Sequence, residues 1–367
     1  MTTNFSVAAG PYAGREVLRF SNILVRATNW VGDAVMCVPA LQALRTHHPQ
    51  ARISILARPW VAGLYGRESF CDELIPYEAA RGWRGLRSQY ALARRLRTNK
   101  FDAAILLQNA FEAAALAWMA RIPVRIGYDR DGRGFLLTHS IRLPGPGEIP
   151  VHQRFYYLEL LKRAGVIPAS AVSSESIHLE GAGAAAGSGT ETFRIAGLHG
   201  MVVGLAPGAA YGGAKRWLPE RFASSAVGIV RAMGGGSVAV FGSTQEQDIC
   251  RQVAQAVEGA GVRCINFAGR TTLTQLVDCI AACEVFLTND SGAMHIASAL
   301  GVRTIAIFGA TDHYATGPTG ENARVVRHPV ECSPCLLREC PIDHRCMTGV
   351  TVDRVVDEAL LLVAARK

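Results

Sequence analysis

The sequence predicts an α/β protein of two domains with a similar plan, each built on a parallel sheet with helices on both faces. Short runs rich in apolar and β-branched residues alternate with helix-like stretches along the chain. Such uninterrupted apolar runs are typical of parallel strands that are buried on both faces. At 367 residues, the chain is too long for one ordinary core and fits two domains of roughly 150 to 180 residues each.

The expected strands fall in both halves of the chain. They cover residues 23–27, 53–57, 103–107 and 124–127 in the first half, and 201–206, 238–242, 264–268, 285–288 and 304–309 in the second. Because residues 181–197 are rich in small residues, we expect a linker there. This leaves an N-terminal domain at 20–180 and a C-terminal domain at 198–350. An amphipathic helix at 351–367, with Thr351 as its N-cap, could pack across both lobes.

Composition limits the class of protein and its partners. The chain is 49% hydrophobic and carries a formal net charge of +8, so we expect a globular protein that meets an anionic partner. No apolar run reaches the roughly 18 to 20 residues that cross a bilayer. The first residues do not read as an export signal. We therefore expect a cytoplasmic protein.

The first informative loop is Asn29-Trp-Val-Gly-Asp33, which follows the first predicted strand and precedes a helix-like run to Arg45. A carboxylate in the first turn of a helix is stabilised by the unpaired N–H groups there. Asp33 is therefore either a simple helix-capping residue or a general base that takes a proton from an incoming hydroxyl.

The second informative loop is residues 288–295, between a predicted strand and another helix-like run. Ser291 and Gly292 would offer consecutive N–H groups to a diphosphate at the helix start, and His295 could add a further hydrogen bond. Alternatively, Ser291 is an N-cap, Asp290 a turn residue and His295 an ordinary buried or surface histidine.

Two further strand ends carry charged residues. Lys215 or Arg216 could neutralise charge on a departing phosphate in place of a metal ion, or the two could be a solvated basic pair. Glu246 follows another strand, where carboxylates commonly hold ribose hydroxyls. It is equally an ordinary acid of a first helical turn.

Together these motifs resemble glycosyltransferase family 9, the bacterial lipopolysaccharide heptosyltransferases, over nearly the whole chain. The stretches that carry the resemblance are Asn29-Trp-Val-Gly-Asp33, Pro39-Ala-Leu-Gln-Ala-Leu44, Gln108-Asn-Ala-Phe111, Ile122-Pro-Val-Arg-Ile-Gly127, Ala206-Pro-Gly208, Lys215-Arg-Trp217 and Thr288-Asn-Asp-Ser-Gly292 with His295. The Trp before Val-Gly-Asp and the Gln-Asn-Ala-Phe stretch are more similar to the heptosyltransferase II group than to the heptosyltransferase I group.

The resemblance implies a GT-B architecture, in which two Rossmann-like lobes face a cleft. It implies inverting transfer of L-glycero-D-manno-heptose from ADP-heptose to the first heptose of the Kdo-lipid A inner core, with no metal required. It assigns the base to Asp33. The donor-binding residues it implies are Lys215, Glu246, Asp290, Ser291, Gly292 and His295.

The acceptor side of the site is expected in the first domain. Candidate acceptor-binding residues are Asn29, Trp30, Arg130 and Arg133. Arg130 and Arg133, like Arg81, Arg84 and Arg87 around Trp83, could meet acceptor phosphates or the inner membrane surface. A solvated basic face is the alternative.

A group of four cysteines, Cys332, Cys335, Cys340 and Cys346, stands apart from this chemistry in the sequence. Its spacing could enclose a structural zinc ion or an iron–sulfur cluster, or it could hold nothing. Two disulfides are disfavoured in a reducing compartment. The six scattered cysteines are expected to be reduced and mostly buried.

Other functions fit the sequence less well. A family 9 enzyme with a different acceptor, like heptosyltransferase I or III, is the nearest alternative. A nucleotide-sugar oxidoreductase would need a Gly-x-Gly-x-x-Gly turn after the first strand, where the chain has only Gly32. A nucleic-acid-binding protein would need aromatic residues among the basic ones, and aromatic residues are only 7% of the chain.

Overall fold

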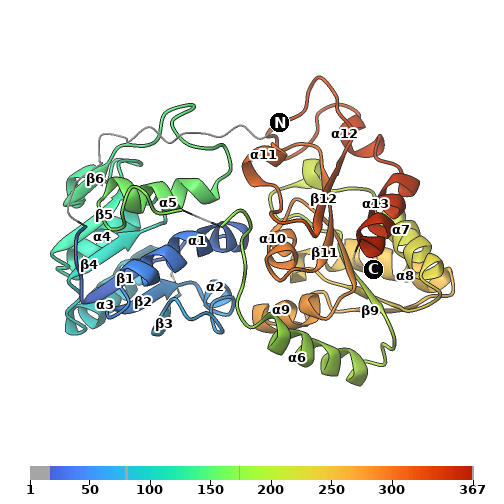
Figure 1. The fold of residues 1–367 in the computed structure, drawn as a ribbon, viewed down its shortest axis with the longest axis horizontal. Coiled ribbons are helices and arrows are strands. Elements are labelled where there is room, and N and C mark those ends of the chain that lie inside the picture. Colours follow the sequence, from blue (N-terminus) through green and yellow to red (C-terminus); the bar gives the residue numbers. More distant parts are fainter. Residues whose placement is uncertain (1–16, 79–81, 173, 366–367) are drawn as a thin grey trace. The chain divides into compact units, whose positions relative to one another are not determined.

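The computed structural model describes residues 17–365 except 79–81 and 173. The chain divides into two units, of which the first is Met1–Asn29 with Met36–Ser174 and the second is Trp30–Val35 with Glu175–Lys367. Figure 1 draws the first unit mainly in blue to green and the second mainly in green to red. The start of the chain, on which the export-signal argument rests, lies outside the described residues.

The first unit is a six-stranded parallel sheet with helices between its strands. Its strands are β1 (Asn22–Arg26), β2 (Arg52–Ala57), β3 (Glu73–Pro76), β4 (Ala103–Leu106), β5 (Val124–Tyr128) and β6 (His139–Ile141). Its helices are α1 (Val31–His47), of which the residues to Val35 are assigned to the second unit, α2 (Pro59–Ala62), α3 (Gly82–Thr98), α4 (Phe111–Met119) and α5 (Arg154–Arg163), with a 3-10 turn η1 (Gly134–Leu136). The strand order is β3-β2-β1-β4-β5-β6.

Alternate strand residues build a core on the face covered by α3 and α4. Leu24, Leu56 and Leu106 point to this face and are at most 2% exposed. Because the intervening residues are also buried, the strands are apolar along their whole length, which is the pattern from which the parallel sheet was predicted.

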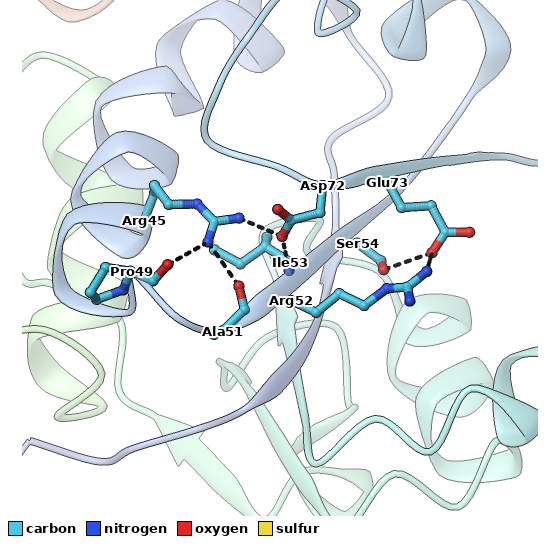
Figure 2. A network of polar contacts seen from close by, with 8 residues as sticks. All are labelled: Arg45, Pro49, Ala51, Arg52, Ile53, Ser54, Asp72 and Glu73. Atoms are coloured by element: carbon cyan, nitrogen blue, oxygen red, sulfur yellow. Dashed lines mark hydrogen bonds and ion pairs between the residues drawn. The ribbon is translucent and has the colours of Figure 1, made fainter.

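A polar network at the amino ends of β2 and β3 holds the end of α1 (Figure 2). Arg45 of α1 donates to the Ala51 carbonyl at 2.8 Å and to the Asp72 carboxylate at 2.5 Å, and Asp72 also accepts from the Ile53 amide at 2.7 Å. Burial acts to raise the pKa of Asp72, but these two donors lower it below its ordinary value. The network therefore lies at the edge opposite to the carboxyl ends of these strands.

The second unit repeats the same plan. Its strands are β7 (Val202–Ala206), β8 (Ser237–Val240), β9 (Arg263–Asn266), β10 (Val285–Asn289), β11 (Arg303–Phe308) and β12 (Ala323–Arg327). Its helices are α6 (Ala182–Ile195), α7 (Pro219–Ala232), α8 (Gln247–Gly259), α9 (Leu273–Ala281), α10 (Gly292–Ala299), α11 (His313–Thr316), α12 (Arg345–Thr348) and α13 (Val352–Ala364), with 3-10 turns η2 (Gly213–Lys215) and η3 (Thr244–Glu246).

Strand order in the second unit is β9-β8-β7-β10-β11-β12, which is the order of the first unit with each strand replaced by its counterpart. All of its pairings are parallel. Its main core lies between the sheet and α7, α8 and α13, where Leu205, Leu287 and Ile305 are completely buried. The prediction of two similar parallel-sheet domains is confirmed.

The segment expected to be a linker is a helix, so that prediction was wrong. α6 packs directly on α9. A Cβ atom at Gly189 of α6 would lie 2.0 Å from the Asp278 carbonyl oxygen. The small residues of 181–197 therefore allow two helices to approach closely, and the division between the units falls earlier, after Ser174.

The last helix forms as predicted at its start. The Thr351 hydroxyl accepts a hydrogen bond from the Arg354 amide and caps α13. In the structure it packs on α7, β11 and β12 of the second unit; packing across both lobes stays a prediction. No helix among the described residues is long and apolar enough to span a bilayer.

Candidate active site

Strand order indicates where each unit binds a ligand. In a parallel sheet of this order, ligands bind at the carboxyl edge of the sheet, at the point where the strand order reverses. In the second unit this position lies between β7 and β10, which pair directly. The loop after β7, residues 207–217, carries Lys215 and is called the lysine loop below. The loop after β10 carries Asp290, Ser291 and Gly292.

Lys215 and Asp290 form a buried ion pair at this position. The Lys215 ammonium lies 2.6 Å from Asp290 Oδ2, and the two side chains are 13% and 6% exposed. The Thr311 hydroxyl, in the loop after β11, donates to the same carboxylate oxygen at 2.6 Å. The ammonium also lies over the Tyr211 ring, 4.8 Å from its centroid. Lys215 is therefore held in one place, and the alternative of a solvated basic pair does not apply to it.

Asn289, the last residue of β10, joins the two loops, a role that was not predicted from the sequence. Its amide donates to the Pro207 carbonyl at 2.8 Å, and its side-chain oxygen accepts from the Trp217 amide at 3.0 Å. The residue is completely buried. It fixes both ends of the lysine loop. Its place in the Thr288–Gly292 motif was visible in the sequence, but its partners were not.

The N-cap residue of α10 makes no side-chain capping bond. Ser291 has the extended backbone of an N-cap, but its hydroxyl lies 3.0 Å from the Thr288 hydroxyl and makes no capping bond. The N–H groups of a first helical turn have no partner within the helix, so the turn beginning at Gly292 can receive an anion. His295 is buried one turn further along α10.

Glu246 has the geometry of a capping residue, which agrees with its alternative interpretation as an acid of a first helical turn. Its Oε2 accepts from the Ser243 amide at 2.8 Å and from the Ser243 hydroxyl at 2.7 Å. Its other carboxylate oxygen packs against Gly208, where a Cβ atom would lie only 2.1 Å away. The loops after β7 and β8 are therefore in contact, and Glu246 lies beside the lysine loop.

In the first unit, the corresponding position lies between β1 and β4. Asn29 follows β1, where its side-chain oxygen accepts from Arg26 at 3.1 Å and its carbonyl accepts from the Trp60 indole at 3.0 Å. Burial lowers the pKa of Arg26 to about 10, although the nearby Tyr77 and Glu112 oppose this shift. Unpartnered buried oxygens at this edge are those of Thr28 and Gln108.

Asp33 lies in the first turn of α1 and is half-buried. The helix begins two residues before it, at Val31, so the carboxylate is close to the N–H groups of the first turn, as the sequence predicted. Trp30, just before the helix, has a side chain that is 62% exposed.

The two predicted acceptor-side arginines differ in exposure, and one prediction needs correction. Arg130 is exposed, and its guanidinium lies 3.7 Å from the Asp131 carboxylate. Arg133 is completely buried. Its donors go to the carbonyls of Tyr128 and Gln108 and, at 2.9 Å, to the Asn109 side chain. Arg133 therefore supports the loop after β4 from inside and is not proposed as a direct contact to the acceptor.

The expected basic surface is only partly covered by the described residues. Arg87 on α3 is exposed. Arg81 lies outside the described residues, and so do the side chains of Trp83 and Arg84.

The segment that contains the four clustered cysteines contacts the lysine loop despite its distance in the sequence. All ten cysteines of the chain are free thiols. Burial, followed by the charges of its three clustered neighbours, raises the pKa of Cys346. Among the described residues, no three His, Cys, Asp or Glu side chains are grouped so as to hold a metal ion. Bound zinc or an iron–sulfur cluster stays a prediction.

Comparison with known proteins places this geometry in a family. Residues 89–345 match glycosyltransferase family 9 (heptosyltransferase). Lipooligosaccharide heptosyltransferase 2 of Haemophilus influenzae is 32% identical over 317 residues, 83% of this chain and 88% of that protein. Lipopolysaccharide heptosyltransferase 2 of Escherichia coli is 30% identical over 93% of this chain and 98% of its own length.

A solved structure agrees with this result. The structure of Escherichia coli ADP-heptose lipopolysaccharide heptosyltransferase II superimposes with a TM-score of 0.77 at 28% identity, and the match covers 94% of this chain and 99% of that one. The chain belongs to glycosyltransferase family 9, the heptosyltransferases.

Proposed function

We propose that this chain transfers L-glycero-D-manno-heptose from ADP-heptose to the first heptose of the Kdo-lipid A inner core, with inversion at the anomeric carbon. The family and its heptosyltransferase 2 relatives support the donor and the class of acceptor. The observation that carries the proposal is the Lys215–Asp290 pair at the carboxyl edge between β7 and β10, where a sheet of this order binds a nucleotide.

In the proposed reaction, one displacement makes and breaks all the bonds. The acceptor hydroxyl oxygen attacks the anomeric carbon as the bond to the diphosphate oxygen breaks, and ADP leaves. The Asp33 carboxylate takes the hydroxyl proton late in this step, when that oxygen has become acidic, so a base of low pKa is adequate. No covalent intermediate on the protein is needed.

The donor diphosphate would lie at the start of α10. Its oxygens would accept from the first-turn amides at Ser291 and Gly292, while the Lys215 ammonium offsets the charge that grows on departing ADP. Asp290 would hold that ammonium in place, and His295 would donate to the diphosphate or the sugar. Glu246 would use the oxygen not engaged by Ser243 to accept from a ribose hydroxyl.

The acceptor would be held by the first unit and the loop before α1. Asn29, Trp30 and Arg130 are the proposed contacts, with Arg130 exposed and able to pair with an acceptor phosphate. Exposed basic residues such as Arg87 would allow peripheral contact with the cytoplasmic face of the inner membrane, where a lipid-anchored acceptor is found. Catalysis itself would need no metal ion.

The function is tested by ADP release from ADP-heptose with three purified acceptors that carry no, one or two heptoses on Kdo-lipid A. The one-heptose acceptor should give the highest kcat/KM, and its product should gain a single heptose of inverted anomeric configuration. A preference for either of the other acceptors would indicate a heptosyltransferase I- or III-like enzyme. Absence of ADP release with all three would overturn the proposed function.

A further inference from the structure

The four clustered cysteines belong to a segment that contacts the loops carrying Lys215 and Thr311, two residues of the proposed donor site. This segment, residues 332–346, has almost no regular secondary structure and begins shortly after β12. It is called the Cys-rich segment here. Its contacts with the lysine loop and with the loop after β11 connect it to the proposed donor site.

Hydrogen bonds attach the Cys-rich segment to the first two residues of η2 in the lysine loop. The Arg338 carbonyl accepts from the Ala214 amide at 2.9 Å, and the Glu339 carboxylate accepts from the Gly213 amide at 2.9 Å. His344 Nε2 lies 3.0 Å from the Ala214 carbonyl. These bonds are made to the two residues that directly precede Lys215.

Tyr211 extends the connection to the Lys215 side chain itself. Its hydroxyl donates to the Leu336 carbonyl at 2.8 Å. The Lys215 ammonium and the Arg338 guanidinium both lie over its ring, 4.8 Å and 5.4 Å from the centroid. The segment therefore supports the surface on which the lysine side chain rests.

The same segment also holds the loop that carries Thr311, the second partner of Asp290. The Ser333 hydroxyl donates to the Gly309 carbonyl at 2.5 Å, and the Leu336 amide donates to the Ala310 carbonyl at 2.8 Å. The Cys346 sulfur packs against Gly309, where a Cβ atom would lie 2.8 Å away. Both members of the ion pair thus have a neighbour fixed by the Cys-rich segment.

Gly212 shows how close the approach is. Its φ is +157°, and a Cβ atom there would lie 2.2 Å from the Arg338 carbonyl oxygen. The lysine loop can keep its path only if residue 212 has no side chain or if the Cys-rich segment moves away.

We propose that the Cys-rich segment is a positioning element of the donor site, in which Glu339 sets the position of Lys215 through the Gly213 amide and so sets the affinity for the sugar-nucleotide donor. This proposal rests on the proposed function, in which Lys215 meets the donor diphosphate. Glu339 is exposed, so replacing it removes a contact without opening the core.

The first test compares Glu339→Ala, Glu339→Gln and wild type in the full-length protein. Glu339→Ala should raise the KM for ADP-heptose about 3- to 10-fold, the loss expected for one typical hydrogen bond, with kcat changed less than about twofold. Glu339→Gln keeps an acceptor oxygen for the Gly213 amide and should restore most of the donor affinity. Glu331→Ala, which removes an exposed carboxylate just before the segment, is the charge-matched control.

A second measurement reports on position without using activity. Hydrogen–deuterium exchange at the Gly213 and Ala214 amides should be faster in Glu339→Ala than in wild type, and Glu339→Gln should reverse much of the change. Wild-type exchange or a wild-type donor KM in Glu339→Ala would overturn the proposal. Lys215→Ala, measured alongside, distinguishes failure of the positioning role of Glu339 from failure of the proposed function. An unchanged donor KM in Lys215→Ala would exclude Lys215 from the donor site of the proposed function.

Gly212→Ala provides a further variant at the same contact. It should raise the donor KM more than Glu339→Ala, because the new methyl group displaces the Arg338 carbonyl. Gly187→Ala on α6, where a Cβ atom has nothing within 4 Å, is the matched glycine control. Equal donor KM values in Gly212→Ala and Gly187→Ala would count against the proposal.

Discussion

The carboxylate of Asp290 lies 2.6 Å from the ammonium of Lys215, although the residues are 75 positions apart in the sequence. The two side chains come from the loops after β10 and β7, on either side of the point where the strand order reverses. Because both are largely buried, each holds the other in place, since a buried charge without a partner is costly. An oriented cation is thereby ready for a diphosphate.

Replacing Lys215 by Ala should raise the KM for ADP-heptose about 10- to 100-fold, which is the range for losing a charge-assisted contact. It should also lower the melting temperature, because Asp290 stays buried without its cation. Steady-state kinetics and thermal unfolding measure the two effects. Arg194→Ala removes an exposed cation of α6 in the same unit and should change neither. A wild-type donor KM in Lys215→Ala would exclude the proposed phosphate contact.

Arg133→Ala should destabilise the protein by about 3 kcal/mol or more, because it leaves several buried carbonyl groups without donors. Urea unfolding measures this change. Arg133→Lys should not rescue it, since a single ammonium cannot reproduce the guanidinium fork. Arg130→Ala, an exposed neighbour, should change stability by no more than about 0.5 kcal/mol. Equal stability of the Arg133 and Arg130 variants would contradict the structural role of Arg133.

Acid should remove the stabilising contribution of Glu148. Hydrogen bonds from Arg142 and Arg163 lower the pKa of Glu148 from 4.5 to about 2. A carboxyl group with a lowered folded-state pKa stabilises the fold above its unfolded pKa, and this contribution is lost as the pH falls through the folded value. The melting-temperature difference between wild type and Glu148→Gln should therefore be largest near neutral pH and shrink between pH 4.5 and about 2.

A matched glutamate distinguishes this effect from general acid sensitivity. Glu258 is exposed on α8, and the difference between wild type and Glu258→Gln serves as the reference. A Glu148→Gln difference that stays constant with pH would show that the two arginine contacts do not hold the carboxylate.

Central strands could be predicted from the sequence because they are apolar along their length. β1, β7 and β10 were each placed to within a residue or two. The strands that were missed, β3, β6 and β12, all lie at sheet edges, where one side faces no neighbouring strand. Their residues are partly exposed, so they lack the continuous apolar run on which the prediction depended.

Local composition misled the prediction where packing determines the residue type. Small residues at 181–197 suggested flexibility, but Gly189 is small because the backbone of α9 lies against it. Likewise, Arg133 and Arg130 differ by three positions and look alike in the sequence, while only the fold decides which one is buried. The strand-end motifs were found because glycine and charged residues after an apolar run are a local signal. Glu339 has no such signal, because it follows no apolar run.

The proposed reaction depends on Asp33 acting as the base. The most direct test is the kcat for ADP release from saturating ADP-heptose and heptosyl-Kdo-lipid A, compared between wild type and Asp33→Asn, with the Kd for ADP measured by calorimetry in both. We expect kcat to fall by about a thousandfold, within the range for loss of a general base, and the Kd to stay within about twofold. An Asp33→Asn protein with the wild-type kcat would contradict the account.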